Sequence, residues 1–125
     1  MDEIQSKRIE IWNAYHNSLK VLEESKKLSL PVMPHYATNN GHMFYLVCNS
    51  AKERDALISY LKEKEILPTF HYLSLHRSQF FNDTVTHLPY SDKFTERLVR
   101  LPFYYELSMD QLKYITLAIL NFYNL

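Results

Sequence analysis

Groups that could do chemistry are concentrated in one short stretch of the chain, from Phe70 to Phe81. Its sequence, Phe-His-Tyr-Leu-Ser-Leu-His-Arg-Ser-Gln-Phe-Phe, contains two histidines, a tyrosine, two serines and an arginine among three phenylalanines. Titratable and hydrogen-bonding groups between aromatic residues, after a predicted strand, are typical of the wall of a binding site. His71, Tyr72, His76 and Arg77 are therefore candidate site residues.

The same residues also have a purely structural interpretation. Histidines in a turn can be satisfied by backbone carbonyls, and an arginine in a loop is often simply solvated. Residue types and spacing leave both interpretations open for His71, His76 and Arg77. Tyr104 and Tyr105 could stack on a nucleotide base, although the ten tyrosines of the chain favour packing in a core or an interface.

A metal site is a second chemical possibility, because histidine is a common metal ligand. The histidines considered for it are His35, His42, His71, His76 and His87. They lack the tight spacing of a zinc helix or zinc knuckle, and the single cysteine, Cys48, has no second cysteine to help it. We therefore predict no metal site.

Composition narrows the class of protein. A chain of 125 residues forms one domain, and its 14 basic and 14 acidic residues give no basic face for nucleic acid. A single cysteine excludes an internal disulfide and favours a reducing compartment. The sequence shows neither a secretory leader nor an apolar run long enough to span a membrane. We therefore expect a cytoplasmic protein that binds neither nucleic acid nor membrane.

The chain contains only one glycine, Gly41. Loops that cradle phosphate groups with backbone amides need several glycines, so a P-loop or a dinucleotide fingerprint is excluded. A phosphorylated ligand would have to be held by side chains or by a partner domain.

Hydrophobic spacing and capping signals predict an α+β domain. In chain order, the expected elements are a helix over 2–27, a strand over 42–48, a helix over 51–65, a strand over 66–72, an irregular stretch over 73–89, a short helix over 92–98, an extended stretch over 99–103 and a helix beginning after Ser108. This order predicts a small, mostly antiparallel sheet of about three strands with helices packed on one face. The first helix would be long for so small a domain, which suggests a missing neighbour.

Several motifs also occur in the order and at the spacing of a known family. They are Gly41-His-Met-Phe-Tyr-Leu-Val, Arg54-Asp-Ala-Leu-Ile-Ser-Tyr-Leu-Lys, Ile66-Leu-Pro-Thr-Phe-His-Tyr-Leu-Ser-Leu-His and Ser91-Asp-Lys-Phe-Thr-Glu-Arg-Leu-Val-Arg-Leu-Pro-Phe-Tyr. Together they resemble the C-terminal small domain of the sugar-nucleotide aminotransferases of the DegT/DnrJ/EryC1/StrS type. These pyridoxal-phosphate enzymes aminate keto sugars for lipopolysaccharide, O-antigen and deoxysugar antibiotics. The resemblance covers essentially the whole chain.

The resemblance implies that residues 1–125 form a single domain of a larger enzyme with the small-domain fold of the fold-type I aminotransferases. The family's large domain, which is not in this chain, supplies the Schiff-base lysine and most of the phosphate cup. None of the nine lysines here lies in the context that the family uses. The resemblance therefore implies pyridoxal phosphate in the parent protein, no cofactor bound by this chain alone, and no catalytic residue within it.

The family pattern also assigns candidate roles. It places His71, Tyr72 and His76 at the border of the active site, and His42 at a structural or cofactor-side position. The family often has proline at the position of Ser74 and a tyrosine near Phe80. The branch that the chain resembles most uses dTDP-4-keto-6-deoxyglucose as substrate and glutamate as amino donor. Full-length members are homodimers.

The sequence leaves one alternative of a different class. A stand-alone, non-enzymatic α+β interaction module would have the same composition and the same elements. An upstream reading frame that encodes a large domain would distinguish the two.

Overall fold

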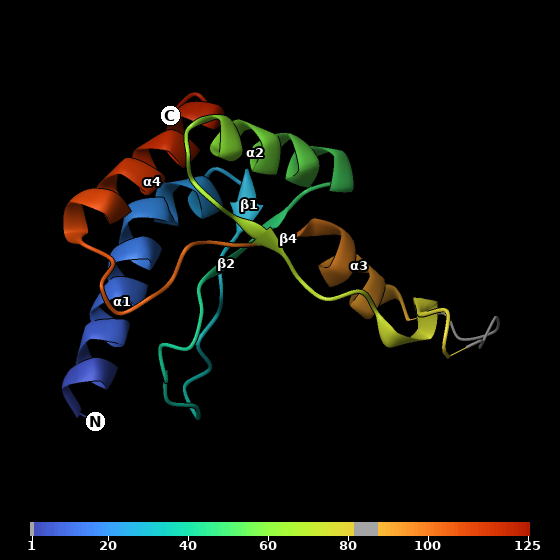
Figure 1. The fold of residues 1–125 in the computed structure, drawn as a ribbon, viewed down its shortest axis with the longest axis horizontal. Coiled ribbons are helices and arrows are strands. Elements are labelled where there is room, and N and C mark those ends of the chain that lie inside the picture. Colours follow the sequence, from blue (N-terminus) through green and yellow to red (C-terminus); the bar gives the residue numbers. More distant parts are fainter. Residues whose placement is uncertain (1, 82–87) are drawn as a thin grey trace.

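The computed structural model describes residues 2–81 and 88–125, and within them it contains four α-helices, one short 3-10 helix and a four-stranded sheet (Figure 1). The elements in chain order are α1 (Asp2–Glu24), β1 (Leu28–Ser29), β2 (Tyr45–Cys48), α2 (Ala51–Glu63), β3 (Thr69–Phe70), the 3-10 helix η1 (Leu75–Arg77), α3 (Pro89–Arg97), β4 (Leu98–Arg100) and α4 (Met109–Phe122). In this part of the chain no helix is both long and apolar enough to cross a membrane.

The sheet has the strand order β1-β2-β4-β3, and all three strand pairs are antiparallel. The predicted α+β class is confirmed, but the expected number of about three strands was too low. The missed strand, β1, has only two residues, too few for an alternating pattern to be visible in a sequence. β3 is also shorter than predicted and begins just after Pro68, which has no N–H to donate to a strand neighbour.

The core lies between the helices and one face of the sheet. α1 buries a stripe on its inner side, as its spacing predicts, formed by Ile11, Trp12, Tyr15, Leu19 and Leu22. The ring of Phe44, just before β2, stacks on Tyr15 at 5.2 Å and meets Trp12 edge-on at 5.4 Å. Trp12 therefore packs in the domain's own core. α4 contacts both α1 and α2, so these three helices form one group.

Helix α3 lies apart from α1 and α4 (Figure 1). It contacts α2, β2 and β4, and together with η1 it extends away from α1 and α4 (Figure 1). The predicted irregular stretch over 73–89 therefore contains η1 and runs into the first residue of α3. Residues 82–87, which include His87, lie outside the described residues.

Both predicted capping signals begin helices, but they are not equally complete. At α4, the Ser108 side chain accepts from the Gln111 N–H, and the Gln111 side chain accepts from the Ser108 N–H. At α2, the Ser50 side chain accepts from the Glu53 N–H, whereas the Glu53 carboxylate accepts from the N–H of Asn49. The glutamate thus satisfies an amide one residue earlier than in the reciprocal motif.

Gly41 lies where the connection between β1 and β2 crosses α1. Its φ of +54° is in the left-handed region, and its N–H donates to the Asn39 side chain. A Cβ at this position would lie 2.9 Å from the backbone carbonyl carbon of Arg8. The single glycine of the chain is thus required by both its backbone conformation and its close approach to α1.

We expect Gly41→Ala to lower the free energy of unfolding by about 1–2 kcal/mol or more, because an L-residue is strained at this φ and its Cβ would collide with α1. Urea denaturation of both chains measures the difference. Thr38→Ala, an exposed position on the same connection, is the control and should change little. Equal midpoints for wild type and Gly41→Ala would contradict this account of the crossing.

Three ionisable groups are buried in the core in their neutral form. Burial raises the pKa of the Cys48 thiol to about 11. Burial also raises the pKa values of Tyr15 and Tyr123 above that of an ordinary tyrosine. The Tyr15 hydroxyl donates to the carbonyl of Pro102 at 2.9 Å, and the Tyr123 hydroxyl contacts the Cys48 sulfur at 3.9 Å.

These groups predict a loss of stability in alkali. In the unfolded chain they ionise near their ordinary values, so above about pH 9 the folded state binds more protons than the unfolded state. The free energy of unfolding should therefore fall as the pH rises from 9 toward 11, and urea midpoints measured across this range test it. Cys48→Ala should make the fall less steep. A midpoint that stays constant to pH 11 in the wild-type chain would refute the prediction.

Candidate functional site

Three side-chain hydroxyls join η1 to α3. Ser74, which precedes η1, is buried and lies 2.5 Å from the Thr95 hydroxyl, measured between oxygens. The Ser91 hydroxyl donates to Ser74 Oγ at 2.9 Å, and Ser74 Oγ also lies 3.3 Å from the Ser91 carbonyl. Because Ser91 and Thr95 are one helical turn apart, α3 presents both to the same serine. The start of η1 is thereby fixed against the helix.

An acidic pair on the same side of α3 holds the two candidate residues of η1. Asp92 Oδ1 lies 3.0 Å from Nε2 of His76 and 2.8 Å from Nε of Arg77. Both are close polar contacts that are off the line of an ideal hydrogen bond. The other arm of Arg77 donates to Glu96 at 3.0 Å. This hydrogen bond is the main reason why the pKa of Arg77 is raised above its usual value.

The surroundings of the two basic residues differ. The side chain of His76 is only 8% exposed and that of Asp92 12% exposed, whereas the side chain of Arg77 is half exposed. Close contacts in a buried setting are stronger than contacts in water, because fewer solvent dipoles screen them. The His76–Asp92 contact is therefore more enclosed than the contacts of Arg77.

The other candidates are arranged more loosely. The His71 ring meets Tyr72 edge-on at 5.2 Å, and Tyr72 is 77% exposed. Nδ1 of His71 is buried and has no hydrogen-bond partner among the residues that the structure describes. His42 is exposed on the chain that leads into β2, whereas η1 follows the edge strand β3 (Figure 1). The structure thus joins His76 with Arg77, leaves His71 and Tyr72 just before them, and keeps His42 separate.

The residues of α3 that complete this arrangement were missed as site residues by the sequence reasoning. Ser91, Asp92, Thr95 and Glu96 recur at the spacing of one helix face, but a polar helix face is usually solvated. One signal in the sequence could have indicated these residues. Pro89 is typical of the first residue of a helix, and a helix that begins there places the four polar side chains on one face. Only the packing of α3 shows that the stripe faces η1.

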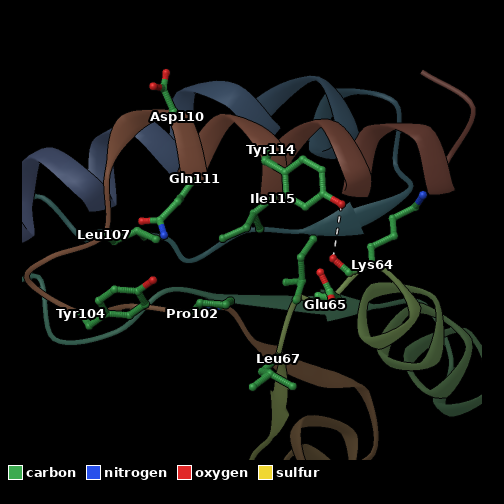
Figure 2. Close-up of a pocket in the computed structure, with 11 residues that line it drawn as sticks. Lys64, Glu65, Leu67, Pro102, Tyr104, Leu107, Asp110, Gln111, Tyr114 and Ile115 are labelled. Atoms are coloured by element: carbon green, nitrogen blue, oxygen red, sulfur yellow. Dashed lines mark hydrogen bonds between the residues drawn. The ribbon is translucent and has the colours of Figure 1, made fainter.

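The surface of the described residues includes a smaller and a larger hollow that could hold a ligand. The smaller, of about 430 Å³, adjoins the candidate site and is lined by Arg54, Asp55, Ile58, Phe70, Leu73, Arg77, Thr95 and Glu96. The larger, of about 570 Å³, lies between the end of α2 and the start of α4 (Figure 2) and is lined by Lys64, Glu65, Ile66, Leu67, Pro102, Tyr104, Leu107, Asp110, Gln111, Tyr114 and Ile115. Tyr104, which could stack on a nucleotide base, lines the larger hollow, whereas His42, His71, Tyr72, His76 and Arg77 do not.

The polar groups of the larger hollow are largely occupied within the domain. The Tyr114 hydroxyl donates to the backbone carbonyl of Lys64, and the side-chain oxygen of Gln111 accepts from the Ser108 N–H. The Lys64 ammonium lies 4.9 Å from the centre of the Tyr60 ring, and Figure 2 shows Asp110 pointing away from the other lining residues. The smaller hollow is therefore the better candidate, because it contains Arg77 and adjoins His76.

A family model matches residues 1–120, nearly the entire chain, and its description is the DegT/DnrJ/EryC1/StrS aminotransferase family. This chain belongs to that family. The family assignment confirms the resemblance read from the motifs, and it does not specify a keto sugar.

Solved structures share the fold. The aminotransferase TlmJ from Streptoalloteichus hindustanus has a TM-score of 0.86 at 21% identity, over 96% of this chain and 32% of its own. PseC from Helicobacter pylori, an aminotransferase of pseudoaminic acid biosynthesis, has a TM-score of 0.81 at 16% identity, over 96% and 33%. NtdA from Bacillus subtilis, whose structure holds the cofactor PMP, has a TM-score of 0.82 at 15% identity, over 95% and 28%. This chain thus spans about a third of each.

The residues of this chain do not fit the covalent site of pyridoxal phosphate. A Schiff-base lysine needs a desolvated pocket that lowers its pKa. All nine lysines lie among the described residues, and none is buried. Lys7 and Lys20 face Glu10 and Glu24 on the surface of α1. Within this domain by itself, therefore, no lysine lies in the desolvated pocket that such a site needs.

We expect Ser74→Ala to lower the free energy of unfolding by about 1–3 kcal/mol, because it leaves the hydroxyls of Ser91 and Thr95 without their shared partner. Hydrogen exchange should accelerate at the Arg77 and Ser78 amides, which donate to the first residues of this turn. Ser59→Ala, at an exposed position of α2, serves as the control. Unchanged exchange at both amides in Ser74→Ala would show that the hydroxyls do not hold η1.

Proposed function

We propose that this chain is the C-terminal small domain of a pyridoxal-phosphate aminotransferase that aminates a nucleotide-linked 4-keto-6-deoxy sugar. The expected substrate is dTDP-4-keto-6-deoxyglucose, with glutamate as amino donor, for lipopolysaccharide or O-antigen synthesis in the cytoplasm. The observation that carries the proposal is the family match over residues 1–120. The sugar pathway of PseC and the PMP cofactor of NtdA support the substrate class and the cofactor.

The proposal includes a large catalytic domain as the main partner of this domain. The structural relatives are about three times as long as this chain. Large apolar side chains are exposed along the stretch that contains β3 and η1, namely Leu67, Phe70, Tyr72, Leu73, Leu75, Phe80 and Phe81. An exposed apolar surface of this kind is typical of an interface. We propose that the large domain covers it and that the full-length enzyme is a homodimer.

Within this arrangement the domain would supply one wall of the cleft and no covalent chemistry. His76 would face the sugar, with His71 and Tyr72 behind it, and His42 would lie on the cofactor side. Among residues 2–81 and 88–125, Nδ1 of His71 has no hydrogen-bond partner. This supports a partner from outside the domain, because a buried polar atom without one is costly. Arg77 already has two carboxylate partners, so its proposed role is to hold α3 rather than to bind phosphate.

The first test compares the chain with the longest reading frame that contains it. Each protein is incubated with pyridoxal phosphate, reduced with borohydride and analysed by mass spectrometry. We expect no single stoichiometric lysine adduct on the 125-residue chain and one unique adduct on the longer protein, outside these residues. One fully modified lysine within the chain would overturn the assignment as a small domain.

The second test measures the reaction of the longer protein with glutamate and dTDP-4-keto-6-deoxyglucose, by the formation of 2-oxoglutarate and of the amino sugar. His76→Ala should lower the rate by about 100-fold or more if the imidazole transfers a proton at the sugar, with unchanged cofactor absorbance. His35→Ala, an exposed histidine on the connection before β2, should have no effect. A frame limited to these 125 residues, without cofactor or activity, would support the interaction module.

A further inference from the structure

The carboxylate of Asp92 occupies a position that sequence reasoning did not assign. It is buried at the start of α3, and both side chains that contact it, His76 and Arg77, come from η1. A buried carboxylate is costly unless it is paired, and here the pairing crosses between two elements rather than staying within one helix. Arg77 keeps its second contact with Glu96. Asp92 is therefore flanked by one permanent cation and one imidazole.

We infer that Asp92 is a positioning residue that orients the His76 ring and holds its proton on Nε2. The inference rests on the proposed function, in which His76 faces the sugar. In a neutral imidazole one nitrogen donates and the other accepts, and the hydrogen bond at one nitrogen selects the tautomer. A carboxylate oxygen 3.0 Å from Nε2 favours the proton at that nitrogen. Nδ1 is then the nitrogen that can accept a proton or a hydrogen bond from a substrate.

The geometry around η1 supports this role over a purely structural one. The start of η1 is already fixed by the hydroxyls of Ser74, Ser91 and Thr95. Glu96 alone could bind the guanidinium of Arg77. Asp92 makes a polar contact to His76 that places a specific ring nitrogen against a charge. The N–H and its acceptor in such a contact can be poorly aligned in a free enzyme and become aligned when substrate binds.

The decisive measurement is the NMR spectrum of the imidazole nitrogens in the 125-residue chain, with the rings neutral. We expect His76 to be almost entirely in the Nε2–H tautomer, with a slowly exchanging Nε2 proton. The exposed ring of His35 in the same sample should show the tautomer mixture of free imidazole, with no visible ring proton. This comparison needs no variant, so it remains decisive if a substitution unfolds α3.

Variants test the cause. In Asp92→Ala the His76 nitrogen signals should move toward the free mixture and the Nε2 proton signal should disappear, while the amide signals of α3 stay in place. Asp92→Glu should restore the proton signal in part. Glu96→Gln, which changes only the second partner of Arg77, should leave the His76 signals unchanged. Wild-type His76 signals that match those of His35, or that do not change in Asp92→Ala, would overturn the inference.

The longer protein then separates this inference from the proposed function. There, Asp92→Ala should lower kcat with little change in KM, and adding it to His76→Ala should cause no further loss. If the losses in kcat caused by Asp92→Ala and His76→Ala multiply in the double variant, Asp92 does not act through His76. If the NMR result holds and the longer protein aminates no sugar, the proposed function fails and the orientation of His76 by Asp92 stands.

Discussion

The packing of α1 against the strand β2 is the interaction on which the rest of the domain depends. Phe44, Leu46 and Cys48 alternate along the chain and point to the same face, where they meet the buried stripe of α1 and the apolar side of α4. Phe44 is fully buried and its ring contacts both Trp12 and Tyr15. Without this contact β2 would have no fixed position, and β2 is one of the two central strands on which the others are added.

From this core, strand pairing determines where the candidate site forms. β3 pairs with β4, so that Phe70 lies opposite Val99 in antiparallel register. The chain that leaves β3 and the helix that enters β4 must therefore run next to each other beyond the sheet. This is why residues 74–77 contact residues 91–96 across almost 20 positions of sequence. The polar contacts of η1 fix an adjacency that the sheet has already imposed.

Ser74 illustrates how one position can be held in two ways. Its φ of −60° is also the value that proline adopts. A proline at this position would fix the same backbone by its ring. Here the chain is held instead by a hydroxyl that contacts Ser91 and Thr95. The serine backbone is less rigid than that of proline, and the hydrogen bonds to α3 hold it in place. The shape of η1 in this chain therefore depends on that helix.

The sequence by itself determined those features whose cause is local. The α1 stripe and the caps at Ser50 and Ser108 follow from side-chain spacing and from hydroxyls that accept backbone amides. The order of these elements was enough to indicate the α+β class. The motifs also indicated the family, which the family model over residues 1–120 confirms.

Only the tertiary structure decided what those residues contact. β1 is too short to leave a pattern, and its place is set by pairing with Cys48 and Val47. Asp92 resembles an ordinary acidic residue in the first turn of a helix until η1 is placed beside it. The Gly41 requirement likewise depends on α1, since Arg8 is 33 positions away in sequence. Such contacts join segments that are distant in the chain, and the physical reason for them is the pairing of strands and the packing of helices rather than any local preference.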